Sequence, residues 1–140
     1  MKRTPLKRKT RLKKKNPNST ASKKRKETRK DYPEFFKKHI GIIRNNNIRC
    51  RECGEKLIGD VSEVAHVLDK QGYPEIATED DNVIYLCSWK SPLNCHSLFD
   101  GTNKQLQGMG VFNTTRQVVI NLINKFNIQL GIKMSDKWKL

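Results

Sequence analysis

The fold is decided by four segments, Cys50-Arg-Glu-Cys53, Val64-Ala-His66, Asn82-Val-Ile-Tyr-Leu-Cys87 and Cys95-His96, in this order along the chain. In a reduced protein, a CxxC pair is more often half of a metal site than a disulfide. Seven residues separate Cys87 from Cys95, whereas the second cysteine pair of such a site is usually separated by two. This longer loop must therefore return to the metal. We expect the four thiols to bind one structural Zn²⁺. Buried free cysteines with one redox pair are the alternative, but no thioredoxin-like βαβ pattern surrounds them.

Residues 1–30 carry nearly all of the net positive charge of the 140-residue chain. They contain 15 Lys or Arg and one acid, Glu27, whereas residues 31–140 contain 14 basic and 13 acidic residues. One six-residue phrase occurs twice, as Thr4-Pro-Leu-Lys-Arg-Lys and Thr10-Arg-Leu-Lys-Lys-Lys. Such a segment cannot bury a core, so we expect a disordered tail at 1–30 and one folded domain at 31–140.

The tail is expected to bind nucleic-acid phosphates without reading the base sequence. A solubilising or targeting tail is an alternative, and binding to a membrane surface is disfavoured because only Leu6 and Leu12 could insert. The residues expected to contact nucleic acid are Lys7, Arg8, Lys9, Lys13, Lys14, Lys23, Lys24 and Arg25.

The sequence shows neither a secretory signal nor a membrane span. The charged start is not followed by an apolar stretch, and no window approaches the ~18 apolar residues of a membrane helix. We expect a cytoplasmic protein without a membrane partner, as a monomer or a weak dimer.

Two amphipathic helices are expected to flank the centre of an α+β domain. The first covers residues 32–43, with Asp31 as its cap and Pro33 in its first turn. The second covers about residues 112–127, and Asn113-Thr-Thr supplies its cap. Its apolar stripe either packs on the core or binds a partner, and consists of Val119, Leu122, Ile123 and Phe126.

Between these helices, residues 61–68 and 82–87 are short and rich in β-branched residues, which predicts two antiparallel strands. A helix of about two turns is expected after its cap Asn94, with Gly101 at its end. The core at 48–101 then has the order zinc hairpin, strand, strand, helix.

This order resembles the HNH, or His-Me finger, endonucleases, which have a ββα-metal core. The resemblance covers residues 50–101 and rests on the CxxC pair, His66 on the first strand, Asp81-Asn82 opening the second, and Leu86-Cys87 and Cys95-His96. The opening Lys-Arg-Thr-Pro-Leu-Lys-Arg-Lys-Thr also looks like that of small phage-encoded HNH and recombination-type nucleases. The resemblance implies a metal-dependent DNA endonuclease that nicks or cleaves DNA, located in the host cytoplasm if phage-encoded.

Hydrolysis of a phosphodiester needs a base for the attacking water and a cation for the phosphoryl charge. A histidine titrates near neutrality and suits the first task. His66 lies where the family keeps its general base, held at its second ring nitrogen by a carbonyl or a similar partner; a half-buried histidine bonded inside the hairpin is the alternative. His39 lies outside the finger and is expected to be a surface or structural residue. By resemblance, Asn82 fixes the loop between the strands through backbone bonds.

His96 directly follows a cysteine, which leaves two roles open. It either replaces one cysteine at the zinc or binds the catalytic ion, and the second role is favoured because four cysteines are available. Asp100 lies four residues further on the same helix face, so the pair could hold one Mg²⁺ or Mn²⁺. Asp100 could equally face water.

Ala65 departs from the family pattern, which commonly has a metal-binding residue just before the base. Either His96 and Asp100 carry the ion with waters, or Glu63 or Asp69 reaches in, or catalysis is lost. The last case describes a non-catalytic zinc-finger DNA-binding or recombination accessory protein. An RNA-binding protein is a third hypothesis, because a polycation does not distinguish the nucleic acids.

The loop between Cys87 and Cys95 contains Trp89 next to Lys90. An exposed aromatic ring beside a cation could stack on a base of single-stranded or distorted DNA. Packing of Trp89 on the zinc site is the alternative.

Deleting residues 1–30 should flatten the salt dependence of DNA binding and leave the zinc-bound fold intact. Each phosphate contact contributes about −0.9 to the slope of log K against log salt for duplex DNA, so removing many contacts reduces the slope. Binding titrations at several salt concentrations measure this, and an unchanged slope would refute the role of the tail.

Overall fold

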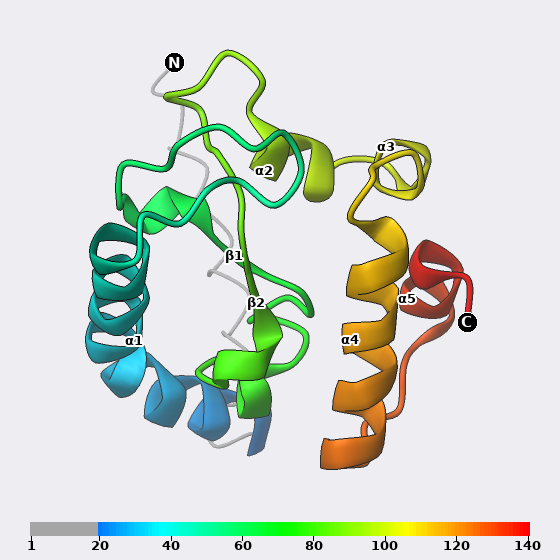
Figure 1. Cartoon of the computed structure of the whole chain (residues 1–140). Coiled ribbons are helices and arrows are strands. Elements are labelled where there is room, and N and C mark those ends of the chain that lie inside the picture. The colour runs from blue at the N-terminus through cyan, green and yellow to red at the C-terminus, as the bar shows by residue number, and fades with distance from the viewer. Residues whose placement is uncertain (1–19) are drawn as a thin grey trace, which may run out of the picture.

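Helices dominate the computed structural model, which describes residues 20–140 and, for side chains, residues from 30 onward. A two-stranded antiparallel sheet lies between two long helices, α1 and α4, with α2 above it (Figure 1). The elements are α1 (Thr20–Asn45), β1 (Val64–His66), β2 (Val83–Tyr85), α2 (Cys95–Phe99), α3 (Asn103–Gln107), α4 (Phe112–Phe126) and α5 (Ile132–Trp138). Within this part of the chain, no helix is long and apolar enough to cross a membrane.

The predicted hairpin is present, with shorter strands than expected. Its register pairs Val64 with Tyr85 and His66 with Val83, and directly paired residues point to the same face of a sheet. The segments just before both strands form 3₁₀ turns instead, Val61–Glu63 and Asp80–Asn82. The first turn is set by a capping box in which the Asp60 side chain accepts from a backbone N–H and Glu63 reaches back to the N-cap backbone.

The first helix begins at Thr20 and not at Asp31, and Pro33 lies inside it. Proline in a helix interior removes one hydrogen bond and displaces the preceding turn, which usually kinks the helix. Figure 1 shows α1 bending between its blue first half and its cyan second half. Residues 20–32 are rich in Lys and Arg and contain one Ala and one Glu, all of which favour helix and explain the extension. Residues 20–30 are therefore helical and not the disordered end of the tail, while residues 1–19 lie outside the described part.

The expected helices after Asn94 and at 112–127 are confirmed as α2 and α4. Asn94 adopts a left-handed conformation, which asparagine tolerates, and its side chain accepts a hydrogen bond from the backbone of Ser97. The expected cap of α4 is wrong: the helix begins at Phe112 as expected, but its N-cap is Val111, without a side-chain cap. Instead, the Glu52 carboxylate accepts bonds from the N–H groups of Gly110 and Val111, at 2.8 and 2.9 Å.

The apolar stripe of α4 packs on the core, as the first interpretation predicts. Val119 and Leu122 are fully buried, and Ile123 and Phe126 pack against the buried cluster. The core continues into α5, where the fully buried Trp138 stacks on Phe112 at 5.7 Å between ring centroids.

His39 is structural. It is 2% exposed, and its two ring nitrogens contact the Tyr85 hydroxyl and the Asp80 carboxylate, the latter at 3.0 Å. Burial lowers its pKa, although the hydrogen bond to Asp80 opposes this shift. The contacts of this histidine join α1 to β2 and to the turn before it.

Candidate functional site

The sulfur atoms of Cys50, Cys53, Cys87 and Cys95 converge from the knuckle after α1, the end of β2 and the start of α2. All four lie within 4.8 Å of one another. A metal–sulfur bond of about 2.3 Å in a tetrahedron places sulfurs about 3.8 Å apart, and the Sγ atoms of Cys53 and Cys87 are 3.7 Å apart. No pair forms a disulfide. Four thiols so arranged could hold a metal ion, and among the described residues this is the one cluster of three or more potential ligands.

Backbone N–H groups support the thiol cluster. Cys95 donates its backbone N–H to Cys87 Sγ at 3.3 Å. Burial by itself raises the pKa of Cys50, but hydrogen bonds from the backbone of Cys53 and Cys87 outweigh it and lower that pKa. Burial and the neighbouring thiols raise the pKa of Cys95. A metal ion would offset the cost of gathering several thiolates in one buried place.

His66 lies at the end of β1, half-buried beneath α1. Its Nε2 lies 2.8 Å from the carbonyl oxygen of Ala77. Because a carbonyl only accepts, Nε2 carries the proton and donates, which leaves Nδ1 as the acceptor nitrogen of the neutral ring. The ring stacks on Phe35 at 5.9 Å and meets the edge of Phe36 at 6.0 Å.

The surroundings of His66 favour its neutral form. Burial lowers its pKa, and the nearby positive charge of Lys70 acts in the same direction. The bond to Ala77 and the negative charge of Asp100 oppose this shift. A neutral imidazole near pH 7 is the form that can accept a proton.

His96 and Asp100 form a pair on α2. His96 Nδ1 donates to the Ser62 carbonyl at 2.6 Å, and its Nε2 lies 2.9 Å from Asp100 Oδ2. The hydrogen bond to Asp100 raises the pKa of His96, against the effect of burial. The two atoms face each other, and the Asp100 side chain is 60% exposed, so a divalent ion could replace the shared proton there.

Asn82 makes the backbone bonds to the loop that the resemblance implies. It is fully buried, accepts from Leu68 N–H at 2.7 Å, and donates to the carbonyls of Leu68 and Ile76 at 2.9 and 3.2 Å. These bonds close the loop that carries the Ala77 carbonyl, which in turn holds His66.

The two acids considered as substitute ligands, Glu63 and Asp69, bond to backbone N–H groups near them in the chain. Glu63 is 4% exposed and accepts bonds from the N–H groups of Ile58, Gly59 and Asp60. Asp69 accepts from Gly72 N–H. Ala65 is fully buried in the core. Of Glu63, Asp69 and Asp100, only Asp100 pairs with His66 or His96.

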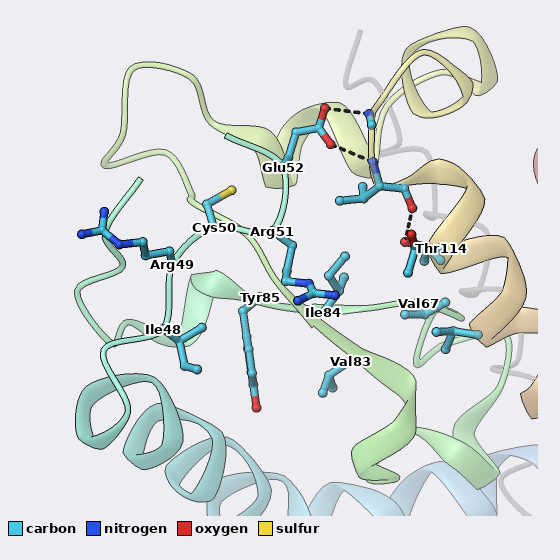
Figure 2. Close-up of a pocket in the computed structure, with 14 residues that line it drawn as sticks. Ile48, Arg49, Cys50, Arg51, Glu52, Val67, Val83, Ile84, Tyr85 and Thr114 are labelled. Carbon is cyan, nitrogen blue, oxygen red and sulfur yellow. Dashed lines mark hydrogen bonds between the residues drawn. The ribbon is translucent and has the colours of Figure 1, made fainter. Parts of the chain in front are cut away.

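A groove of about 710 Å³ lies beside the hairpin. The knuckle, the strands and the start of α4 line it, and Figure 2 shows Arg51 and Tyr85 among the lining residues. His66, His96 and Asp100 are not among its lining residues, so the groove is separate from the histidine site.

The basic residues expected to contact nucleic acid lie outside the part of the chain with described side chains. No family model, curated protein or solved structure matches the chain.

The carbonyl or similar partner expected at His66 is the carbonyl of Ala77. The sequence does not show which residue supplies it, and sequence reasoning missed the Ser62 carbonyl that holds His96. A backbone carbonyl leaves no mark in the sequence. The sequence does contain two capping-box motifs, Asp60-Val-Ser-Glu63 and Thr102-Asn-Lys-Gln105. They predict the turn at Ser62 and helix α3.

Replacing Asn82 with alanine should lower the free energy of unfolding by about 3 kcal/mol, because three buried backbone groups lose their partner. Asn82→Asp should also destabilise, since its carboxylate would face two carbonyl oxygens. Chemical denaturation measures both. Asn46→Ala, at an exposed side chain that bonds Ile42, is the control, with a change within about 0.5 kcal/mol. Equal stability of the Asn82 and Asn46 variants would contradict the role of Asn82.

Proposed function

We propose that this protein is a metal-dependent DNA endonuclease of the HNH type. In this proposal, β1, β2 and α2 form a ββα-metal core, His66 is the general base, and His96 and Asp100 hold a catalytic Mg²⁺ or Mn²⁺. The observation that carries it is a pair of histidines on β1 and α2 whose surroundings differ. One is held neutral by burial, with a free acceptor nitrogen, and the other is aligned with a carboxylate.

The division of roles follows from the surroundings of each ring. Groups whose pKa values are pushed apart by their environment are candidates for distinct catalytic tasks. His66 is suited to take a proton from water at Nδ1, while Ala77 keeps the ring in place. The negative charge of Asp100 opposes the lowering of the pKa of His66, so the proposed base and the proposed ion ligand interact electrostatically.

The chemistry is attack of a water molecule on phosphorus, with loss of one strand oxygen. His66 accepts the proton of the water as the new P–O bond forms. A divalent ion at His96 and Asp100 would supply stabilisation of charge on the phosphoryl and leaving oxygens. By family resemblance, the 3′ oxygen leaves, takes up a proton, and the products are a 5′-phosphate and a 3′-hydroxyl.

We further propose that the metal of the four thiols is structural Zn²⁺. A four-sulfur tetrahedral donor set without an open position is typical of structural zinc. The four cysteines complete this set, so His96 is left for the second ion.

A non-catalytic DNA-binding protein is the second candidate. Ala65 is the observation that favours it, because Glu63 and Asp69 are engaged elsewhere and do not replace a ligand at position 65. In the nuclease proposal, the catalytic ion would have only two protein ligands, His96 and Asp100. This number still suits Mg²⁺, because this ion usually keeps several waters.

The first experiment is relaxation of supercoiled plasmid by the purified protein with added Mg²⁺ or Mn²⁺. We expect relaxed or linear DNA, and a loss of activity of about 10²- to 10⁴-fold in His66→Ala. Ser97→Ala, an exposed change beside His96 on α2, is the matched control and should cut normally. A clear mobility shift with intact plasmid would instead support the non-catalytic candidate.

The pH profile gives a second readout of the same proposal. The base acts when it is neutral, so the rate should rise with pH through the pKa of His66. Because burial lowers that pKa, the midpoint should fall below 6.5, its ordinary value. A divalent ion would also have to displace the proton that His96 and Asp100 share, and this step depends on pH too. The rates are therefore compared at saturating metal, so that the pH profile reports His66. A midpoint well above 6.5 would contradict His66 as the base.

Purified protein should contain one zinc ion per chain by elemental analysis. Removal of that ion by a chelator, or Cys87→Ser, should lower the melting temperature, because the metal binding energy is part of the folding energy. Ser88→Ala, next to the ligand, should keep the zinc. A full complement of metal in Cys87→Ser would contradict the assigned site.

A further inference from the structure

We infer that Trp89, in the loop between Cys87 and Cys95, is a stacking platform for an unpaired base of a DNA strand bound at the histidine site. The inference rests on the proposed function and names its substrate class, DNA with a single-stranded or distorted segment. The loop runs from the end of β2 to the start of α2, at the top of Figure 1.

The ring of Trp89 is open to a ligand. The residue is 70% exposed, in contrast to the fully buried Trp138. Lys90 Nζ lies 5.3 Å from the ring centroid, and among the described residues no aromatic ring packs on Trp89. The packing of Trp89 on the thiol cluster, considered from the sequence, does not occur. A large apolar side chain kept so exposed contributes little to folding.

The loop that carries this ring is held firmly. Ser88 Oγ accepts a hydrogen bond from Ser62 Oγ at 2.8 Å, and Ser91 donates to the Glu55 carboxylate. Lys90 pairs with Asp60, which lowers the pKa of Asp60 to about 2, so this contact persists across the neutral range. Cys87 and Cys95 fix both ends of the loop. An aromatic ring on a preorganised loop loses little conformational freedom when it binds a ligand.

Ser62 links the loop to the histidine site. Its carbonyl accepts from His96 at 2.6 Å, while its hydroxyl bonds Ser88, the neighbour of Trp89. Two hydrogen bonds through Ser62 thus connect His96, the proposed ion ligand, to Ser88 at the start of the loop. A strand whose phosphate lies at His96 and Asp100 would carry its flanking bases past this loop.

An unpaired base fits the ring better than a duplex or a protein surface does. A base offers its π face only when it is unstacked, and stacking on tryptophan tolerates any base. Lys90 supplies a positive charge over the ring, and the net charge of +15 on the chain favours a polyanion. A protein partner would contact apolar surface in general. It would therefore also use Leu93, the other large exposed apolar residue of the loop, which is 60% exposed.

Intrinsic fluorescence of the full chain tests the inference without added Mg²⁺ or Mn²⁺, so that no strand is cut. Oligo-dT should quench the Trp89 emission, and a duplex of the same phosphate count should quench it much less. The emission of Trp138 serves as an internal reference, because this residue is buried against Phe112 and DNA should not quench it. The wild-type measurement does not depend on any variant being folded.

Binding of the variants gives the second arm, at one fixed salt concentration. Trp89→Ala should weaken oligo-dT binding about tenfold, which is within the range for the loss of one stacked base, and leave duplex affinity within about twofold. Trp89→Phe should restore most of the loss, and Leu93→Ala should bind as the wild type does. Zinc content and melting temperature check that each variant is folded.

Four outcomes would overturn the inference: equal quenching by single strand and duplex, unchanged oligo-dT affinity in Trp89→Ala, an equal loss in Leu93→Ala, or tighter binding of oligo-U than of oligo-dT. These results are independent of plasmid cleavage. Quenching without cleavage would overturn the nuclease proposal alone, and cleavage without quenching would overturn the stacking role alone.

Discussion

The convergence of four thiols is the constraint on which the centre of this structure depends. The sheet contributes only three residues from each strand, and an isolated two-stranded hairpin is marginally stable at best. Cys87 lies just beyond β2 and Cys95 is the first residue of α2, so one metal ion would fix the helix relative to the strands and to the knuckle at Cys50 and Cys53. His96 follows Cys95 directly, and its position is therefore set by the same constraint.

Helix α1 gives the hairpin its second support and shapes the surroundings of His66. His39 reaches from α1 to Tyr85 on β2 and to Asp80, while Phe35 covers His66. This packing removes water from one side of His66 and lowers its pKa, whereas His96, opposite Asp100, has a raised pKa. Two histidines in one small domain thus acquire different proton affinities from neighbours that belong to different elements.

The elements that were predicted correctly carry their signals locally. The β-branched runs predict β1 and β2, Asn94 predicts the start of α2, and the apolar period predicts α4. The predicted start of α1 is wrong because a proline is expected in the first turn of a helix, whereas the residues before Pro33 favour helix strongly enough to continue through it with a bend. Short helix α5 is held by the burial of Trp138, a tertiary contact that no local pattern shows. The candidate site was predicted to the extent that it consists of side chains; the carbonyls of Ala77 and Ser62, which orient the histidines, become visible only when the chain is folded.

The seven residues between Cys87 and Cys95 exceed the usual two without disturbing the turn at the base of the loop. The backbone of Cys95 still donates to Cys87 Sγ, and His96 N–H still bonds the Cys87 carbonyl at 2.9 Å. Since the two ends of the insertion are joined in this way, its extra length adds only a small closure entropy, which grows with the logarithm of loop length. The inserted residues are therefore not needed to complete the thiol cluster. Their contacts with Asp60, Ser62 and Glu55 hold the loop in one conformation that keeps Trp89 exposed, and this combination of rigidity and exposure suits the recognition of a ligand better than it suits stability.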